Sequence, residues 1–175
     1  IVVHTSGRYG AEVLRPAMAA HILPVAIHPA MTFTGTALDL GRLEECAFGV
    51  TGPDALRPMA EALVVEMGGE PVWVPESQRA AYHAALAHGS NHLVTLVAEA
   101  MEILSAAGAA DPAGTLRPLL TAALDNALAQ GDAALTGPIV RGDLGTVRAH
   151  LEDITANAPQ TLPSYVALAR ASLDR

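Results

Sequence analysis

Apolar residues in the first 75 positions fall in short runs separated by turns. Runs at 1–3, 25–27, 46–51 and 71–74 are rich in β-branched residues and predict four strands. Stretches 10–21 and 53–67 space their apolar residues as helices do. Pro53 and the Gly68-Gly69 pair suit the beginning and end of the second helix. Strands that alternate with helices predict an α/β layer of parallel strands joined by right-handed crossovers.

After residue 75 the strand pattern disappears. Residues 77–107 predict one long helix, about 45 Å at 1.5 Å per residue. Shorter helices are predicted at 112–129, 144–156 and 163–173. The apolar arc of the long helix is broader than the face of a surface helix, so it needs partners on several sides. We expect the later helices and a second copy of the chain to supply them, which predicts a homodimer. The chain is thus divided into 1–75 and an all-helical 76–175.

The first run, Ile1-Val2-Val3, leads directly into the polar turn His4-Thr5-Ser6-Gly7. It reads as a buried parallel strand, and such a strand needs cover on both faces and both edges. We therefore expect earlier strands of the same sheet to lie outside this chain. On this interpretation the chain is the C-terminal part of a longer protein, and its first 75 residues are the α/β remnant of a larger sheet.

Composition narrows the classes of function. Apolar residues make up 51% of the chain and aromatic residues 3%, so Ala, Leu and Val must build the core. A net charge of -8 argues against nucleic acid as a partner. No apolar run approaches the roughly 20 residues of a membrane span, and no signal peptide is visible, so we expect a cytoplasmic protein. Cys46 is the only cysteine, which excludes an intrachain disulfide or a cysteine metal cluster.

Two predicted strands end in polar turns that begin with histidine. His4, Thr5 and Ser6 follow the first strand, and His28 follows the second. Ligands of open α/β sheets bind outside the carboxyl ends of the strands, so these side chains are candidates for a site. The alternative is that His4, Thr5 and Ser6 only cap the next helix and satisfy backbone donors.

The long helix carries a second group of candidates. His88 and His92 are four residues apart, a spacing that can hold a metal, but Gly89 stands where zinc proteases have glutamate. We therefore favour a solvated polar face at this position and predict no metal. His83 lies at the margin of the apolar arc and Asn91 at its border, two turns further on. Together they could hydrogen-bond one substrate, although a histidine beside an apolar surface is more often structural.

A third candidate is the loop Leu135-Thr136-Gly137-Pro138-Ile139-Val140-Arg141-Gly142-Asp143, which lies between helices. Asp143 is placed to cap the next helix. Arg141 could bind a carboxylate through two hydrogen bonds, or it could be a solvated arginine on a rigid turn. The chain has no G-x-G-x-x-G, no P-loop and no G-x-S-x-G elbow.

The segments "HTSGRYGAEVL", "IHPAMTF", "AFGVTGPD", "GGEPVWV", "YHAALAHGSNHLVTL" and "ALTGPIVRGD" resemble one family over nearly the whole chain, from Val2 to about Leu151. They are similar to an uncharacterised group of Rossmann-like NAD(P)-dependent oxidoreductases. That group is related to ketopantoate reductase, pyrroline-5-carboxylate reductase and the hydroxyacid dehydrogenases. The resemblance implies the last strands of a Rossmann-type sheet, followed by a helical domain that helps to form dimers. It also implies a glycine-rich dinucleotide site on a preceding domain.

The resemblance also implies roles for residues. His4, Thr5 and Ser6 would line the nicotinamide side of a cleft and bind NADP or NAD. His28 lies in a turn similar to one in prephenate dehydrogenases, and Asn91 matches a substrate-binding asparagine of ketopantoate reductases. Beside these implied roles, we predict that Thr136 orients the substrate and that Arg141 holds its carboxylate.

One departure from the family concerns the proton donor. Ketopantoate reductase and hydroxyacid dehydrogenases use a lysine as general acid, whereas all ten basic residues here are arginine. We therefore predict His83 as proton donor, with Asn91 beside it, for hydride transfer to a small carboxylate-bearing carbonyl or imine. The alternative is a non-enzymatic dimerisation or ligand-binding module that keeps the fold. This chain alone is expected to be inactive, because most of the cofactor site would lie outside it.

Overall fold

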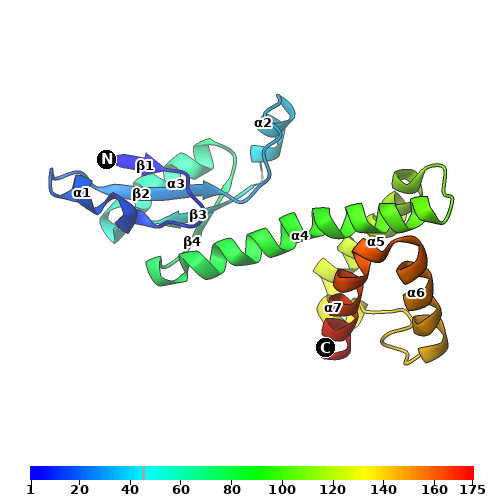
Figure 1. Ribbon diagram of the computed structural model, residues 1–175. Helices are drawn as coiled ribbons and strands as arrows, with labels where there is room; N and C mark the ends of the chain where they lie inside the picture. Colours follow the sequence, from blue (N-terminus) through cyan, green and yellow to red (C-terminus); the bar gives the residue numbers. More distant parts are fainter. Residues whose placement is uncertain (45) are drawn as a thin grey trace. The chain divides into compact units, whose positions relative to one another are not determined.

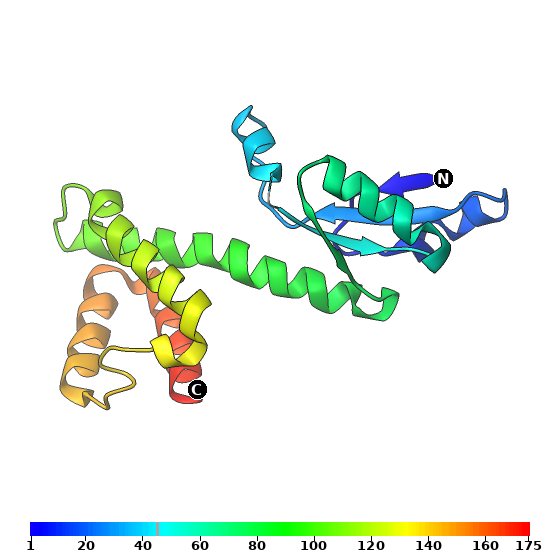
Figure 2. The same cartoon turned by 180° about the vertical axis from the view of Figure 1, so that it is seen from behind.

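The computed structural model describes residues 1–44 and 46–175. It divides into two compact units, residues 1–92 and 93–175. A four-stranded sheet is followed by helices, of which α4 (Arg79–Ala106) is 28 residues long (Figures 1 and 2). The predicted fold class is therefore confirmed. The predicted domain boundary after residue 75 stays a prediction, and α4 itself begins in the first unit and continues in the second.

The sheet of the first unit runs in the order β1-β2-β3-β4. Its strands are β1 (Val2–His4), β2 (Pro24–Pro29), β3 (Ala47–Thr51) and β4 (Glu70–Trp73). The β1–β2 and β3–β4 pairs are parallel, but β2 and β3 are antiparallel. The prediction of a parallel layer is therefore wrong for the central pair. A parallel pair needs a crossover connection that packs back onto the sheet. The connection between β2 and β3 instead contains the six-residue helix α2 (Leu38–Leu43), which stands away from the sheet (Figure 1). This helix was not predicted from the sequence.

The core of the first unit lies between the central strands and one helix. Residues Val25 and Ile27 of β2 and Phe48 and Val50 of β3 pack with Ala60 and Val64 of α3 (Arg57–Glu66). The short 3-10 helix η2 (Asp54–Leu56) precedes α3. β1 lies at one edge of this four-stranded sheet and Val3 is 45% exposed, and the expectation that further strands cover it stays a prediction.

The helix predicted at 10–21 is two short pieces, the 3-10 helix η1 (Ala11–Leu14) and α1 (Arg15–Met18). Pro16 lies in the first turn of α1. Because a proline has no N–H, it cannot continue the hydrogen bonds of η1, and a separate helix begins there. His21, with a φ of 58°, lies in the left-handed region and follows the end of the segment.

The second unit is helical and agrees closely with the sequence pattern. The 3-10 helix η3 (Glu76–Gln78) precedes α4, and α5 (Pro112–Gln130), η4 (Gly131–Ala134), α6 (Leu144–Asn157), η5 (Pro159–Thr161) and α7 (Leu162–Leu173) follow it. The predicted N-cap is confirmed, because the Asp143 carboxylate accepts a hydrogen bond from the Thr146 amide at 3.0 Å. Among the described residues, no helix has the length and apolarity to cross a membrane.

Candidate functional site

The side chain of Arg79 lies buried at the beginning of α4, with only 2% of its surface exposed. Its two terminal nitrogens donate to the backbone oxygens of Gly49 at 3.1 Å and Ser6 at 2.6 Å. In the described part of the chain its Nε has no hydrogen-bond partner. Burial lowers the pKa of Arg79, and Tyr82 and Glu76 oppose that shift. The guanidinium thus links the turn after β1 to β3 through hydrogen bonds and places a buried positive charge next to both.

Tyr82 joins this arginine to His28. The phenol oxygen lies 3.0 Å from Nδ1 of His28, and the two rings meet edge to face. A Cβ on Gly49 would lie 2.5 Å from the same oxygen, so only glycine lets the phenol come so close to β3. Burial raises the pKa of Tyr82, although Arg79 and the Gly49 amide oppose the shift. The pKa of His28 is lowered by burial first, then by the charges of Arg79 and His83. Both groups are therefore neutral at neutral pH.

The imidazoles of His28 and His83 converge on Gly7. A Cβ on Gly7 would lie 2.8 Å from Nε2 of His28 and 2.8 Å from Cδ2 of His83. No other residue type fits there without moving both rings. The absence of a side chain lets both rings, which can donate and accept hydrogen bonds, pack closely against the turn after β1.

A cavity of about 720 Å³ lies next to these histidines, within the first unit. His28, Met31 and Arg42 contribute to one wall, and His83 and Asn91 of α4 contribute to another. Its volume is in the range of small-molecule sites, which are roughly 300–1,000 Å³. Arg42 gives the cavity a cationic group, so a small anionic molecule matches its lining.

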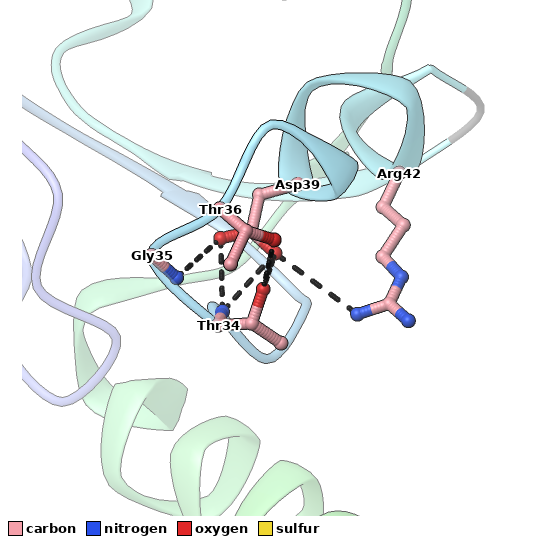
Figure 3. A network of polar contacts seen from close by, with 5 residues as sticks. All are labelled: Thr34, Gly35, Thr36, Asp39 and Arg42. Carbon is pink, nitrogen blue, oxygen red and sulfur yellow. Dashed lines mark hydrogen bonds and ion pairs between the residues drawn. The ribbon is translucent and has the colours of Figure 1, made fainter.

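The segment that carries Arg42 is held by a buried carboxylate (Figure 3). Asp39 accepts hydrogen bonds from the amide and hydroxyl groups of Thr34 and from the Gly35 amide, at 2.8–3.1 Å. The Thr34 amide is the main cause of the lowered pKa of Asp39. Arg42 approaches the same carboxylate at 4.0 Å. Asp39 therefore fixes the loop after β2 and, through it, one wall of the cavity.

Of the residues predicted from the sequence, the structure brings together His28, His83 and Asn91 around this cavity. Thr136 and Arg141 belong to the second unit, where the backbone amide of Arg141 donates to Gly137 in a turn. Their proposed contacts with substrate stay predictions.

The turn after β1 is organised mainly by its own hydrogen bonds. His4 accepts at Nδ1 from the Ser6 amide, and its Nε2 lies 2.9 Å from the backbone oxygen of Gly10. The hydroxyl of Ser6 accepts from the Tyr9 amide, and Thr5 is exposed. These contacts agree with the alternative that His4 and Ser6 satisfy backbone groups of the turn, but neither side chain caps the next helix, η1. The cofactor role of His4, Thr5 and Ser6 stays a prediction.

His88 and His92 lie on the exposed side of α4, and their Nδ1 atoms are 2.8 Å apart. In residues 1–44 and 46–175 no group of three or more His, Cys, Asp or Glu side chains is placed to hold a metal. Further along α4, two glutamates bond to other helices. Glu99 accepts from Ser164 and Glu102 from Gln160, so this part of α4 joins helices of the second unit.

The search of curated proteins found no match. The sequence profile described as "Domain of unknown function (DUF2520)" matches residues 46–172, which is most of the chain. The chain belongs to this family. The relation of the DUF2520 family to ketopantoate reductase, pyrroline-5-carboxylate reductase and hydroxyacid dehydrogenases stays a prediction.

Two solved structures share the fold of this DUF2520 protein. One is protein TM1727 from Thermotoga maritima, with a TM-score of 0.76 and 24% identity over 99% of this chain and 69% of that one. The other is named "putative NADP oxidoreductase BF3122 from Bacteroides fragilis", with a TM-score of 0.80 and 22% identity over 99% and 64%. The chain therefore spans about two thirds of the length of each. At these identities the likeness shows a shared fold and nothing finer.

Sequence reasoning missed four residues that organise the site of this DUF2520 protein: Arg79, Tyr82, Arg42 and Asp39. A signal was present for two of them. Arg79, Tyr82 and His83 are spaced by three and four residues at the beginning of the long helix, which puts them on one side of it. Arg42 and Asp39 had no such signal, because their role depends on α2.

Proposed function

We propose that this protein is an NAD(P)-dependent oxidoreductase that transfers a hydride to a small carbonyl or imine substrate bearing a carboxylate. The observation that carries the proposal is the convergence of His28 and His83 on Gly7 beside a cavity with a cationic wall. Its fold, shared with a Bacteroides fragilis protein named as an NADP oxidoreductase, supports the choice of NADP or NAD as cofactor.

The residues described here fit the reactive end of such a cofactor. The cavity of about 720 Å³ that His28 and His83 line has room for a flat ring and a small substrate. When bound, a reduced nicotinamide would supply the hydride. His83 would give a proton to the reduced substrate, since imidazole is a proton donor suited to neutral pH and the chain has no lysine. Asn91 would orient the substrate, and Arg42 is placed in the cavity to pair with its carboxylate.

Hydride transfer can be tested with the full-length protein by following the loss of NADPH or NADH absorbance with a panel of small 2-oxo acids and cyclic imino acids. We expect His83→Gln to lower kcat about 10²- to 10⁴-fold, the usual contribution of a general acid. His88→Gln is the matched control, because this exposed histidine of the same helix lies outside the cavity lining. Equal rates in both variants would refute His83 as proton donor.

A non-enzymatic ligand-binding module is the second candidate, favoured by the absence of lysine. The melting temperature of the full-length protein in the presence of NADPH separates the two candidates, because a ligand that binds only the folded state raises it. A rise together with turnover supports the enzyme. A rise without turnover of any substrate in the panel supports the binding module, and no rise contradicts the proposed cofactor.

We further propose that the protein forms a homodimer through its helical part. Large apolar side chains of this unit are widely exposed, among them Val94 (69%), Leu128 (80%) and Leu144 (76%). Burying such surface is the main favourable contribution to protein association. Sedimentation equilibrium measures the mass directly, and a monomer at micromolar concentration would contradict the proposal.

A further inference from the structure

The hydrogen bond between Tyr82 and His28 defines which ring nitrogen of His28 carries the proton. A half-buried phenol needs an acceptor for its hydrogen, and Nδ1 of His28 lies 3.0 Å from the phenol oxygen. With Nδ1 accepting, a neutral His28 must carry its hydrogen on Nε2.

The groups around His28 also keep it from taking a second proton. Arg79 stacks its guanidinium on the Tyr82 ring at 5.2 Å and acts on His28 as a positive charge. His83 faces His28 across Gly7 and adds to the same effect when it is protonated. Burial of the His28 ring acts in the same direction and is the largest cause of its lowered pKa. The imidazole is therefore a neutral hydrogen-bond donor.

The ring of His28 packs closely against Gly7. A Cβ on Gly7 would meet Nε2 at 2.8 Å and the neighbouring Cε1 at 2.9 Å. His28 also lines the cavity that holds Arg42 and Asn91. Since Nδ1 is engaged by Tyr82, Nε2 is the nitrogen that His28 can offer to a substrate oxygen in this cavity, while a carboxylate at the other end of the molecule pairs with Arg42.

We propose that the site is built for a carbonyl oxygen rather than a protonated imine, with Nε2–H of His28 as the donor that polarises the carbonyl. The inference rests on the proposed function and narrows its substrate to the 2-oxo acid class. A protonated imine has no lone pair for this donor, and the positive charges of Arg79 and a protonated His83 repel it. Tyr82 and Arg79 are positioning residues that act through His28.

The atoms and charges of the reduction balance as follows. The carbonyl carbon gains the hydride that a reduced nicotinamide supplies when bound, and the electron pair of the C=O π bond moves to the oxygen. His28 holds that oxygen through Nε2–H and keeps its own proton throughout. The oxygen takes a proton from His83, which water then reprotonates. The carbonyl is reduced to an alcohol and the nicotinamide is oxidised.

The first test needs neither cofactor nor activity. Long-range ¹H–¹⁵N spectra of the ¹⁵N-labelled chain near neutral pH distinguish the two neutral tautomers of a histidine from the imidazolium. We expect the Nε2–H tautomer for His28, and we expect Tyr82→Phe to give a mixture of tautomers. An Nδ1–H tautomer or an imidazolium in the wild-type protein overturns the proposal, even if the variant fails to fold.

The second test uses two probes, pyruvate and 1-pyrroline-5-carboxylate. Saturating pyruvate should shift the Nε2 signal of His28, whereas the cyclic imine should leave it unchanged. An effect of the imine alone, or of neither probe, overturns the proposal. With NADPH and a 2-oxo acid that turns over, His28→Phe should lower kcat about 10²- to 10³-fold, as loss of an oxyanion donor does. Tyr82→Phe should lower kcat with less than a twofold change in KM.

Failure of the proposed function would look different. The absence of NADPH oxidation with every substrate, together with the Nε2–H tautomer and the pyruvate shift, would refute the oxidoreductase and leave the carbonyl-binding role of His28. Oxidation of NADPH with cyclic imines alone would keep the oxidoreductase and refute the carbonyl inference.

Discussion

The two units of the chain use their polar side chains in different ways. In the first unit, polar side chains from separate elements converge, so that a buried arginine, a phenol and an imidazole form one chain of contacts. In the second unit most polar contacts are local. The hydroxyls of Thr121, Thr155 and Ser172 bond to the carbonyl four residues earlier in their own helices.

Their cavities differ in the same way. The cavity of the first unit has two histidines, an arginine and an asparagine in its lining. The second unit has a cavity of about 370 Å³ with Leu96, Ile103, Ile139 and Leu168 in its walls, and Glu99 at one side. Convergent polar groups with altered pKa values are typical of sites for chemistry, whereas an apolar groove is typical of packing. This contrast is why we place the candidate chemistry in the first unit.

The largest effect is expected from Arg79→Met, which tests whether the first unit depends on its buried charge. The substitution removes the guanidinium that donates hydrogen bonds to the carbonyl oxygens of Ser6 and Gly49. Because both acceptors lose their partner, we expect the free energy of unfolding to fall by about 2–4 kcal/mol. Urea denaturation measures the loss. Arg148→Met changes an exposed arginine of α6 and should alter stability by less than about 0.5 kcal/mol. Similar losses in both variants would remove the proposed contrast between the units.

The sequence predicted the helices and strands better than the contacts between them. Apolar spacing located α4 to α7 within a few residues, because each helix carries its own pattern. It did not predict that β2 and β3 are antiparallel, since strand direction depends on the connection and not on the strands. His28 and His83 were found as candidates, but their convergence on Gly7 joins residues far apart in sequence. Arg79 was missed because nothing in a single sequence shows that a charged side chain is buried.

Gly7→Ala tests whether the rings of His28 and His83 pack against Gly7 as closely as described. The new Cβ would press on both imidazoles, so we expect a loss of about 1–3 kcal/mol in the free energy of unfolding and shifted ring signals of His28. Gly89→Ala is the opposite control. That glycine lies within α4 with no atoms near its Cβ position, so alanine should stabilise the protein by about 0.5–1 kcal/mol. Gains in both variants would show that the histidines do not converge as described.

Acid should loosen the loop that carries Arg42. Hydrogen bonds, first of all from the Thr34 amide, lower the pKa of Asp39 in the folded state. The carboxylate therefore stabilises the loop fully above the unfolded-state pKa of about 3.9, and this contribution is lost as the pH falls through the lower folded value. The amide ¹H shifts of Thr34 and Gly35 report the transition. We expect a midpoint below that of a free aspartate.

Asp39→Asn is the control for this titration. The amide keeps the shape of the side chain but has no carboxylate to protonate, so the Thr34 and Gly35 signals should no longer move at acid pH. A midpoint at the ordinary aspartate value, or the same titration in Asp39→Asn, would show that Asp39 does not hold the loop. The cavity wall would then need another support.

The smallest effect is expected in the second unit, where Ser164 makes one of the few polar contacts between helices. Its hydroxyl donates to Glu99 and also approaches the Thr161 carbonyl, so its single hydrogen is shared between two acceptors. We expect Ser164→Ala to cost about 0.5–1.5 kcal/mol in urea denaturation. Ser172→Ala, in the same helix, removes only a bond to the Leu168 carbonyl and should change stability by less than about 0.5 kcal/mol. A loss for Ser164→Ala as large as that for Arg79→Met would show that the second unit, too, is organised around a polar contact.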